Sequence, residues 1–106
     1  MKFGLDQNTI NKIHAVFEKH SEIETVLIYG SRAKGNYKDG SDIDISLKGK
    51  NLNESIRSKI FWEIDELNTP YLFDISIYDE IDSEELKAHI DRVGKVFYQN
   101  HAYQES

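Results

Sequence analysis

The chain has 106 residues, 39% of them hydrophobic, and 13 Lys+Arg against 19 Asp+Glu give it a formal net charge of −6. This hydrophobic share excludes a disordered chain, and the length suits a single domain, residues 1–106, with one modest core. The chain has no cysteine, which excludes disulfides and thiolate metal sites and suits a reducing compartment, so we expect a cytoplasmic protein. No apolar run approaches the roughly 18 residues of a membrane span. The acidic balance argues against direct nucleic-acid binding.

The first part of the chain is expected to form a helix, a strand and a loop. Helical spacing of four apolar residues predicts a helix that follows the capping-type stretch Asp6-Gln7-Asn8 and ends near His20: Ile10, Ile13, Val16 and Phe17. Residues 23–29 are apolar and rich in β-branched side chains, as in a strand buried on both faces. Residues 30–40 are polar and rich in glycine, which predicts a loop with a turn of helix at its start.

The middle of the chain is expected to contain two strands separated by a helix. Apolar and polar residues alternate over residues 42–47 and again over residues 72–78, which predicts two strands that each have one apolar face. Between them, residues 53–67 carry one apolar stripe at helical spacing. That helix is expected to end before Pro70, because the residue preceding a proline avoids the helical conformation.

The last part of the chain is expected to be helical. Cap signals over residues 81–85 introduce a helix with Leu86, Ile90 and Val93 on one side, and residues 96–98 are expected to continue its packing. The order of the elements predicts an α/β (α+β) fold with a sheet of three or slightly more strands, covered by helices on one face. The pattern does not determine the directions of the strands.

Gly30 and Ser31 form a candidate phosphate-binding turn. A buried strand is expected to end at Tyr29, and the glycine after it lets the backbone come close to a ligand. The Ser31 hydroxyl lies beside backbone N–H groups that can hold phosphate oxygens. Taken alone, a Gly-Ser pair after a strand is more often a simple turn.

Asp42, Asp44 and Asp74 form the strongest candidate site. Asp42 and Asp44 project from the same face of their strand, about 6–7 Å apart along the chain. Asp74 lies opposite the apolar residues of its own strand, so all three carboxylates share one face if both apolar faces meet the helices. Such a group repels itself unless cations bridge it, and its oxygen ligands favour Mg²⁺ or Mn²⁺, two of which can support nucleotidyl transfer. The alternative is an ordinary polar face exposed to solvent.

Together these residues resemble the signature of the DNA-polymerase-β-type nucleotidyltransferases: Gly30-Ser31, ten intervening residues, Asp42-Ile43-Asp44, and a later acidic strand, Phe73-Asp74-Ile75. The loop Gly-Ser-Arg-Ala-Lys-Gly and the small size are similar to the minimal nucleotidyltransferases, the MntA-like antitoxins. The resemblance covers nearly the whole chain, through residues 93–98. It implies a mixed sheet with helices packed on one side.

The resemblance also implies how a nucleotide is held. Gly30 and Ser31 would hold the nucleotide triphosphate. Arg32 and Ser41 occupy family positions near the phosphates.

For the three carboxylates, the resemblance implies metal binding and catalysis. Asp42 and Asp44 would ligate two Mg²⁺ ions, and Asp74 would complete one metal site and help to deprotonate the acceptor hydroxyl. Members of this group transfer AMP from ATP to a tyrosine hydroxyl of a HEPN-domain (HepT-like) ribonuclease toxin and so neutralise it. The resemblance therefore implies ATP as substrate and a HEPN-domain toxin as partner.

Two other functions stay open at this point. One is an antitoxin that blocks its toxin by contact alone, and the other is a small-molecule nucleotidyltransferase that works with a separate acceptor-binding subunit. A transferase that modifies RNA is disfavoured by the net charge of −6. A chain of 106 residues supplies a nucleotide site without an obvious acceptor pocket, so we expect another molecule to supply the acceptor.

Trp62 is a candidate interface residue. On a regular helix over residues 53–67, it lies nearly opposite the apolar stripe. It either anchors a protein partner or is covered by a second layer of packing or by the tail around Phe97.

Overall fold

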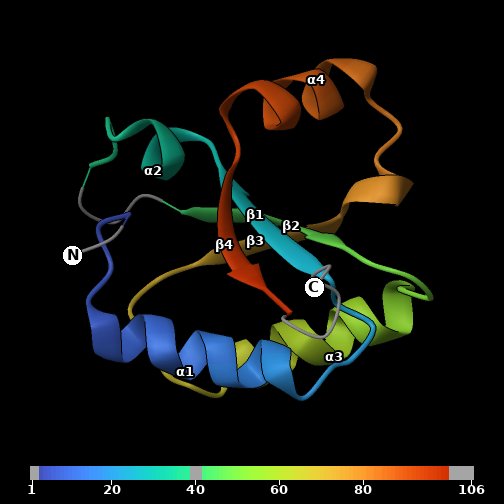
Figure 1. Ribbon diagram of the computed structural model, residues 1–106. Helices are drawn as coiled ribbons and strands as arrows, with labels where there is room; N and C mark the ends of the chain where they lie inside the picture. Colours follow the sequence, from blue (N-terminus) through green and yellow to red (C-terminus); the bar gives the residue numbers. More distant parts are fainter. Residues whose placement is uncertain (1–2, 39–41, 101–106) are drawn as a thin grey trace, which may run out of the picture.

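The structure, a computed structural model, describes residues 3–38 and 42–100. These residues form a four-stranded sheet, in the order β3-β2-β1-β4, with helices on both sides (Figure 1). In chain order the elements are α1 (Gln7–Glu18), β1 (Thr25–Tyr29), α2 (Ser31–Lys34), β2 (Ile43–Lys48), α3 (Glu54–Asp65), β3 (Phe73–Ile77), the 3₁₀ turn η1 (Tyr78–Glu80), α4 (Glu84–Val93) and β4 (Lys95–Gln99). Every predicted helix and strand is confirmed to within a few residues. In the described ranges, no helix is both long and apolar enough to cross a membrane.

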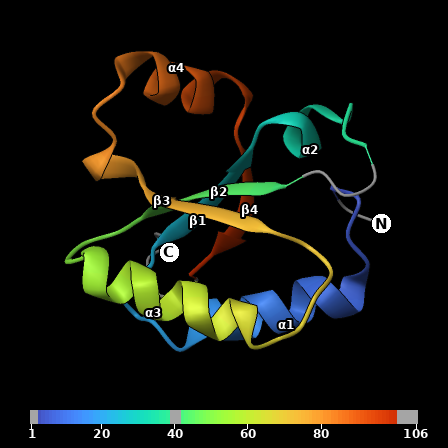
Figure 2. The ribbon, with the colours of Figure 1, turned by 180° about the vertical axis from the view of Figure 1, so that it is seen from behind.

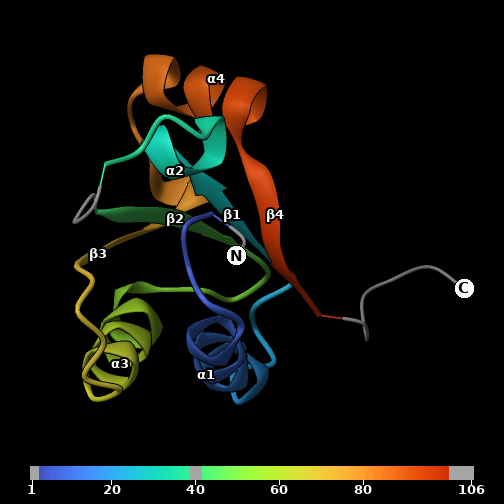
Figure 3. The same ribbon diagram turned by 90° about the vertical axis from the view of Figure 1, so that its left-hand side faces the viewer.

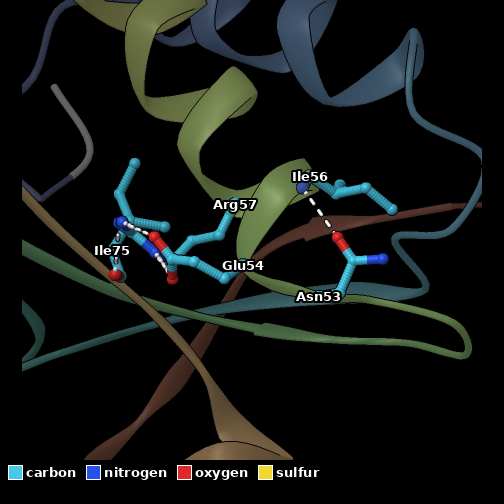
Figure 4. A network of polar contacts seen from close by, with 5 residues as sticks. All are labelled: Asn53, Glu54, Ile56, Arg57 and Ile75. Atoms are coloured by element: carbon cyan, nitrogen blue, oxygen red, sulfur yellow. Dashed lines mark hydrogen bonds and ion pairs between the residues drawn. The ribbon is translucent and has the colours of Figure 1, made fainter.

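The three longer helices each begin at a side chain that accepts a backbone hydrogen bond. Asp6 accepts from the N–H of Thr9 at 2.8 Å at the start of α1. Asn53 accepts from the N–H of Ile56 at 2.9 Å at the start of α3 (Figure 4). Ser83 has the same role for α4. These caps satisfy N–H groups that have no partner inside the helix, so each helix begins directly after its capping residue, within a few residues of the predicted start.

The helices divide between the two faces of the sheet, whereas the sequence pattern and the family resemblance placed them on one face. α1 and α3 lie together under one face, and α2 and α4 lie over the other (Figure 3). Viewed from behind, α3 runs beneath β3 and β2 (Figure 2). The main core lies between the sheet and the α1–α3 layer, and its strand residues project from one face of the sheet, at every second position: Val26, Ile28, Ile43, Ile45 and Ile75. α4 buries Ile90, whereas Leu86 and Val93 are half-buried.

The sheet is mixed, as the family resemblance implied. β2 pairs antiparallel with β1 and parallel with β3, and β4 pairs antiparallel with β1. The parallel pair needs a long crossover, and α3 provides it by carrying the chain back along the sheet between β2 and β3. The register of this parallel pair matters for the site, because it decides which residues of β2 and β3 are direct neighbours.

Residues 96–98 belong to a fourth strand, β4, which the sequence pattern did not identify as a strand. Val96 pairs with Leu27 and Tyr98 pairs with Val26, so Phe97 between them forms a β-bulge. The Nε2 of His14 donates to the Phe97 carbonyl at 2.7 Å. Helix α1 is therefore hydrogen-bonded to the β-bulge of this edge strand through His14.

Candidate active site

Three side chains from neighbouring strands lie in one row across the sheet. Asp44 of β2 is in register with Tyr29 of β1 on one side and with Asp74 of β3 on the other. Residues paired in this way project from the same face of the sheet, and neighbouring strands lie about 4.7–4.9 Å apart. The register therefore brings Asp44 and Asp74 together on the face opposite the α1–α3 core, as the alternation of the two strands suggested.

The negative charges of Asp42 and Asp74 act on the carboxyl of Asp44. Asp42 directly precedes β2, is exposed, and lies two residues before Asp44. Burial raises the pKa of the Asp44 carboxyl, and the negative charges of Asp74 and Asp42 raise it further. The arrangement therefore gathers negative charge at a partly buried position.

The donor chemistry of this group fits Mg²⁺. Carboxylate oxygens are the ligands that this hard cation prefers, and a nearby cation offsets the repulsion that raises the pKa of Asp44. Within residues 3–38 and 42–100, no three His, Cys, Asp or Glu side chains are already arranged as a metal cluster. The roles of Asp42, Asp44 and Asp74 as metal ligands and catalytic residues stay predictions.

Gly30 brings the loop after β1 directly against Asp44. Its φ of 77° and ψ of −156° fall in a region that essentially only glycine adopts. A Cβ at this position would lie 2.5 Å from Oδ2 of Asp44. Ser31 follows as the first residue of α2 and is half-buried. The structure thus places Gly30 beside the Asp44 carboxylate, with Ser31 as the next residue, and the contact of both residues with a triphosphate stays a prediction.

Arg32 is buried in a cluster of other residues. Its side chain is 3% exposed, and its Nη1 donates to the Phe3 carbonyl at 2.9 Å. Its guanidinium carbon lies 5.1 Å from the ring centroids of both Tyr37 and Tyr71, within the range of a cation–π interaction. Ser41, the other residue expected near the phosphates, lies outside the described residues.

A polar layer next to the carboxylates was not singled out from the sequence. The hydroxyls of Ser76 and Ser46 are 3.1 Å apart, Ser46 is fully buried, and the Tyr29 hydroxyl is hydrogen-bonded to Ser76. Burial raises the pKa of Tyr29, and the charges of Asp74 and Asp44 add to this rise. The signal in the sequence is the period of two, because each serine follows a candidate aspartate by two residues.

Arg57 of α3 braces the outer edge of β3 next to Asp74. Its Nη1 donates to the Ile75 carbonyl at 3.3 Å, and Glu54 holds the guanidinium through hydrogen bonds of 2.7 and 2.6 Å (Figure 4). The bond to Glu54 raises the pKa of Arg57, and the charge of Asp74 makes a smaller contribution in the same direction. The strand that carries Asp74 is therefore held from outside the sheet.

Comparison with known proteins gives both a family and a set of structures with the same fold. The family described as "Polymerase beta, Nucleotidyltransferase" matches residues 11–103. No curated protein matches the sequence.

Among solved structures, the chain is similar to one in the crystal structure of a toxin–antitoxin with AMP-PNP, with 19% identity, a TM-score of 0.70, and coverage of 92% of this chain and 77% of the other. It is also similar to a chain in the tri-AMPylated Shewanella oneidensis HEPN toxin in complex with MNT antitoxin, with 17% identity, a TM-score of 0.67, and coverage of 92% and 76%. A chain of the toxin–antitoxin MntA-HepT matches at 17% identity and a TM-score of 0.66, with coverage of 92% and 75%. These likenesses show a shared fold.

Proposed function

Because this chain belongs to the polymerase β nucleotidyltransferase family, we propose that it transfers AMP from ATP to a tyrosine hydroxyl of a HEPN-domain toxin and so acts as an antitoxin. The observation that carries the proposal is the register that sets Asp44 beside Asp74, with Gly30 against the same Asp44 carboxylate. The solved structures of the same fold support the choice of substrate and acceptor, since one contains AMP-PNP and another a tri-AMPylated HEPN toxin.

In the proposed reaction, the tyrosine oxygen of the toxin attacks the α-phosphorus of ATP. A new O–P bond forms, the bond from the α-phosphorus to its bridging oxygen breaks, pyrophosphate leaves, and Asp74 helps to accept the tyrosine proton. Gly30 and Ser31 hold the triphosphate next to the carboxylates. Two Mg²⁺ ions bound by Asp42, Asp44 and Asp74 would supply Lewis-acid stabilisation of the charge that develops on the phosphate oxygens.

We propose that residues 1–106 act as one domain in the cytoplasm, on a protein partner rather than on nucleic acid. The lack of cysteine suits a reducing compartment, and a net charge of −6 is a poor match for a phosphate backbone. The acceptor is supplied by the partner.

Intact-protein mass spectrometry of a HEPN-domain protein from the same genome tests the proposal. That protein is incubated with ATP, Mg²⁺ and either the wild-type chain or its Asp44→Asn variant. We expect a rise in mass by whole AMP units with the wild-type chain only. The matched control is Asp82→Asn, an exposed aspartate before α4, which we expect to retain the transfer.

The other outcomes separate the competing functions. A stable complex without any change in mass would identify an antitoxin that acts by contact alone. Failure to form a complex would direct attention to small-molecule acceptors.

A further inference from the structure

Arg32 directly follows the proposed phosphate-binding pair, yet its side chain is directed into the protein. At 3% exposure it is one of the few buried polar or charged side chains among the described residues. A buried guanidinium is costly unless it is hydrogen-bonded or otherwise paired, so its contacts should reveal its function.

Among the described residues, the contacts of Arg32 connect α2 to the N-terminal segment, to the loop after α2 and to the segment before β3. Nη1 donates to the carbonyl of Phe3 in the N-terminal segment. The guanidinium lies at equal distances of 5.1 Å from the ring of Tyr37, in the loop after α2, and from the ring of Tyr71, in the segment before β3. Gly4 closes the cluster, because a Cβ there would lie 2.7 Å from Nη1 and 2.5 Å from Cε2 of Tyr37.

These segments lead directly to the strands that carry the carboxylates. Tyr71 adjoins Leu72, whose carbonyl accepts a hydrogen bond of 2.8 Å from the N–H of Ile43. Ile43 is the first residue of β2 and directly precedes Asp44. The Arg32 side chain thus joins α2, which begins at Ser31, to the point where β2 and β3 enter the site.

We propose that Arg32 is a positioning residue that fixes Gly30 and Ser31 relative to the aspartates and does not itself contact the nucleotide. This inference rests on the proposed function, because it assumes that the nucleotide binds at Gly30 and Ser31. To reach a phosphate, the guanidinium would have to give up the Phe3 carbonyl and the Tyr37 and Tyr71 rings together. Lysine cannot replace it, because an ammonium group lacks the planar fork that donates and stacks at the same time.

The first test compares Arg32→Lys with Arg32→Gln by titration of the folded proteins with AMP-PNP and Mg²⁺. We expect both variants to bind about tenfold more weakly, and to a similar extent, because both lose the stacked fork. If Lys retains most of the affinity and Gln does not, the positive charge itself contacts phosphate, and the inference is wrong. Affinity is measured well below the melting temperature of each variant, so a loss of global stability alone leaves it unchanged.

The second test is a double-mutant cycle of Arg32→Lys with Tyr37→Leu. If Arg32 acts through the cluster, Tyr37→Leu weakens nucleotide binding by itself and the double variant is no weaker than Arg32→Lys. If the two effects multiply, Arg32 acts independently of the cluster, which contradicts the inference.

Gly4→Ala provides a variant that keeps Arg32 in case its replacement prevents folding. Its Cβ would displace the Arg32 and Tyr37 side chains, and we expect weaker AMP-PNP binding and faster hydrogen exchange in α2 than in α1. Unchanged affinity in this variant would overturn the inference. If the wild-type chain binds no nucleotide, the proposed function and this inference both fail, whereas wild-type binding with multiplying effects overturns this inference alone.

Discussion

Gly30 and Gly35 lie at the two ends of α2, with φ angles of 77° and 86°. A Cβ at Gly30 would meet Asp44, whereas a Cβ at Gly35 would meet nothing within 4 Å. We expect Gly35→Ala to reduce the free energy of unfolding by about 1 kcal/mol through backbone strain, and Gly30→Ala to reduce it by about 3 kcal/mol or more and to abolish transfer. Urea denaturation and AMP transfer to the partner measure the two effects.

A combined variant separates the contact of Gly30 with Asp44 from backbone strain. Asp44→Ala removes the carboxylate that a Cβ at residue 30 would meet, so in the double variant Gly30→Ala should cost less than in the wild-type chain. Strict additivity would show that only the backbone conformation matters.

The ionised Asp44 carboxylate is expected to lower the stability of the folded chain, although it is a proposed metal ligand. Its folded-state pKa is raised by burial and then by Asp74 and Asp42, so the native state binds the proton more tightly than the unfolded state does. Stability is therefore lost as the pH rises through the folded-state pKa, and at pH 7 the ionised carboxylate costs free energy. We expect Asp44→Asn to raise the free energy of unfolding at pH 7 by up to about 1 kcal/mol.

The same measurement at acidic pH checks the sign. The gain from Asp44→Asn should shrink below about pH 4, where the carboxyl is protonated in both states. Asp42→Asn is the matched control and should change stability less, because Asp42 is exposed. A loss of stability in Asp44→Asn at pH 7 would show that the carboxylate makes a compensating contact.

Among the elements, the N-terminal cap of α3 is suited to a mutational test. Asn53 caps its first turn, and Arg57 in the next turn braces β3. We expect Asn53→Ala to lower the free energy of unfolding by about 1 kcal/mol and Asn53→Ser to restore most of it, because serine is also a good N-cap. Thermal melting measures both, and an equal loss in the two variants would show that the cap bond is not the cause.

The elements that the sequence predicted are those with strong local patterns. Apolar spacing and a capping side chain are enough for α1, and alternation is enough for β2 and β3. β4 lacked such a signal, because residues 96–98 are three apolar residues that follow a helix, and its pairing with β1 depends on residues about 70 positions away.

The candidate site was predictable in part for the same reason. Alternation placed Asp44 and Asp74 on one face of their strands, but only the parallel register makes them neighbours and adds Tyr29 to the row. The contact of Arg32 with Phe3 joins residues 29 positions apart, and no local pattern reports it.

For the whole molecule, exposed apolar side chains are candidate docking positions for the proposed partner. Trp62 on α3 is 59% exposed, so no second layer of the described chain covers it, and Val96 on β4 at the opposite edge is 50% exposed. We expect Trp62→Ser to change the free energy of unfolding by less than about 0.5 kcal/mol and to weaken binding of the proposed HEPN-domain partner about tenfold.

Val96→Ser is the matched control for this experiment. It removes a similarly exposed apolar side chain from the other edge and should leave partner affinity unchanged, as measured by calorimetry. The reverse result, with Val96→Ser as the weaker binder, would place the partner on the β4 edge instead.

Both outer strands of the sheet have a backbone carbonyl occupied by a helix side chain. Arg57 donates to Ile75 on β3, and His14 donates to Phe97 at the bulge of β4. Bare sheet edges are templates on which further copies of a chain add as strands and grow into fibrils. The carbonyls of Ile75 and Phe97 are already hydrogen-bonded and do not pair with an added strand. The folded chain is therefore expected to resist amyloid-like aggregation at high concentration.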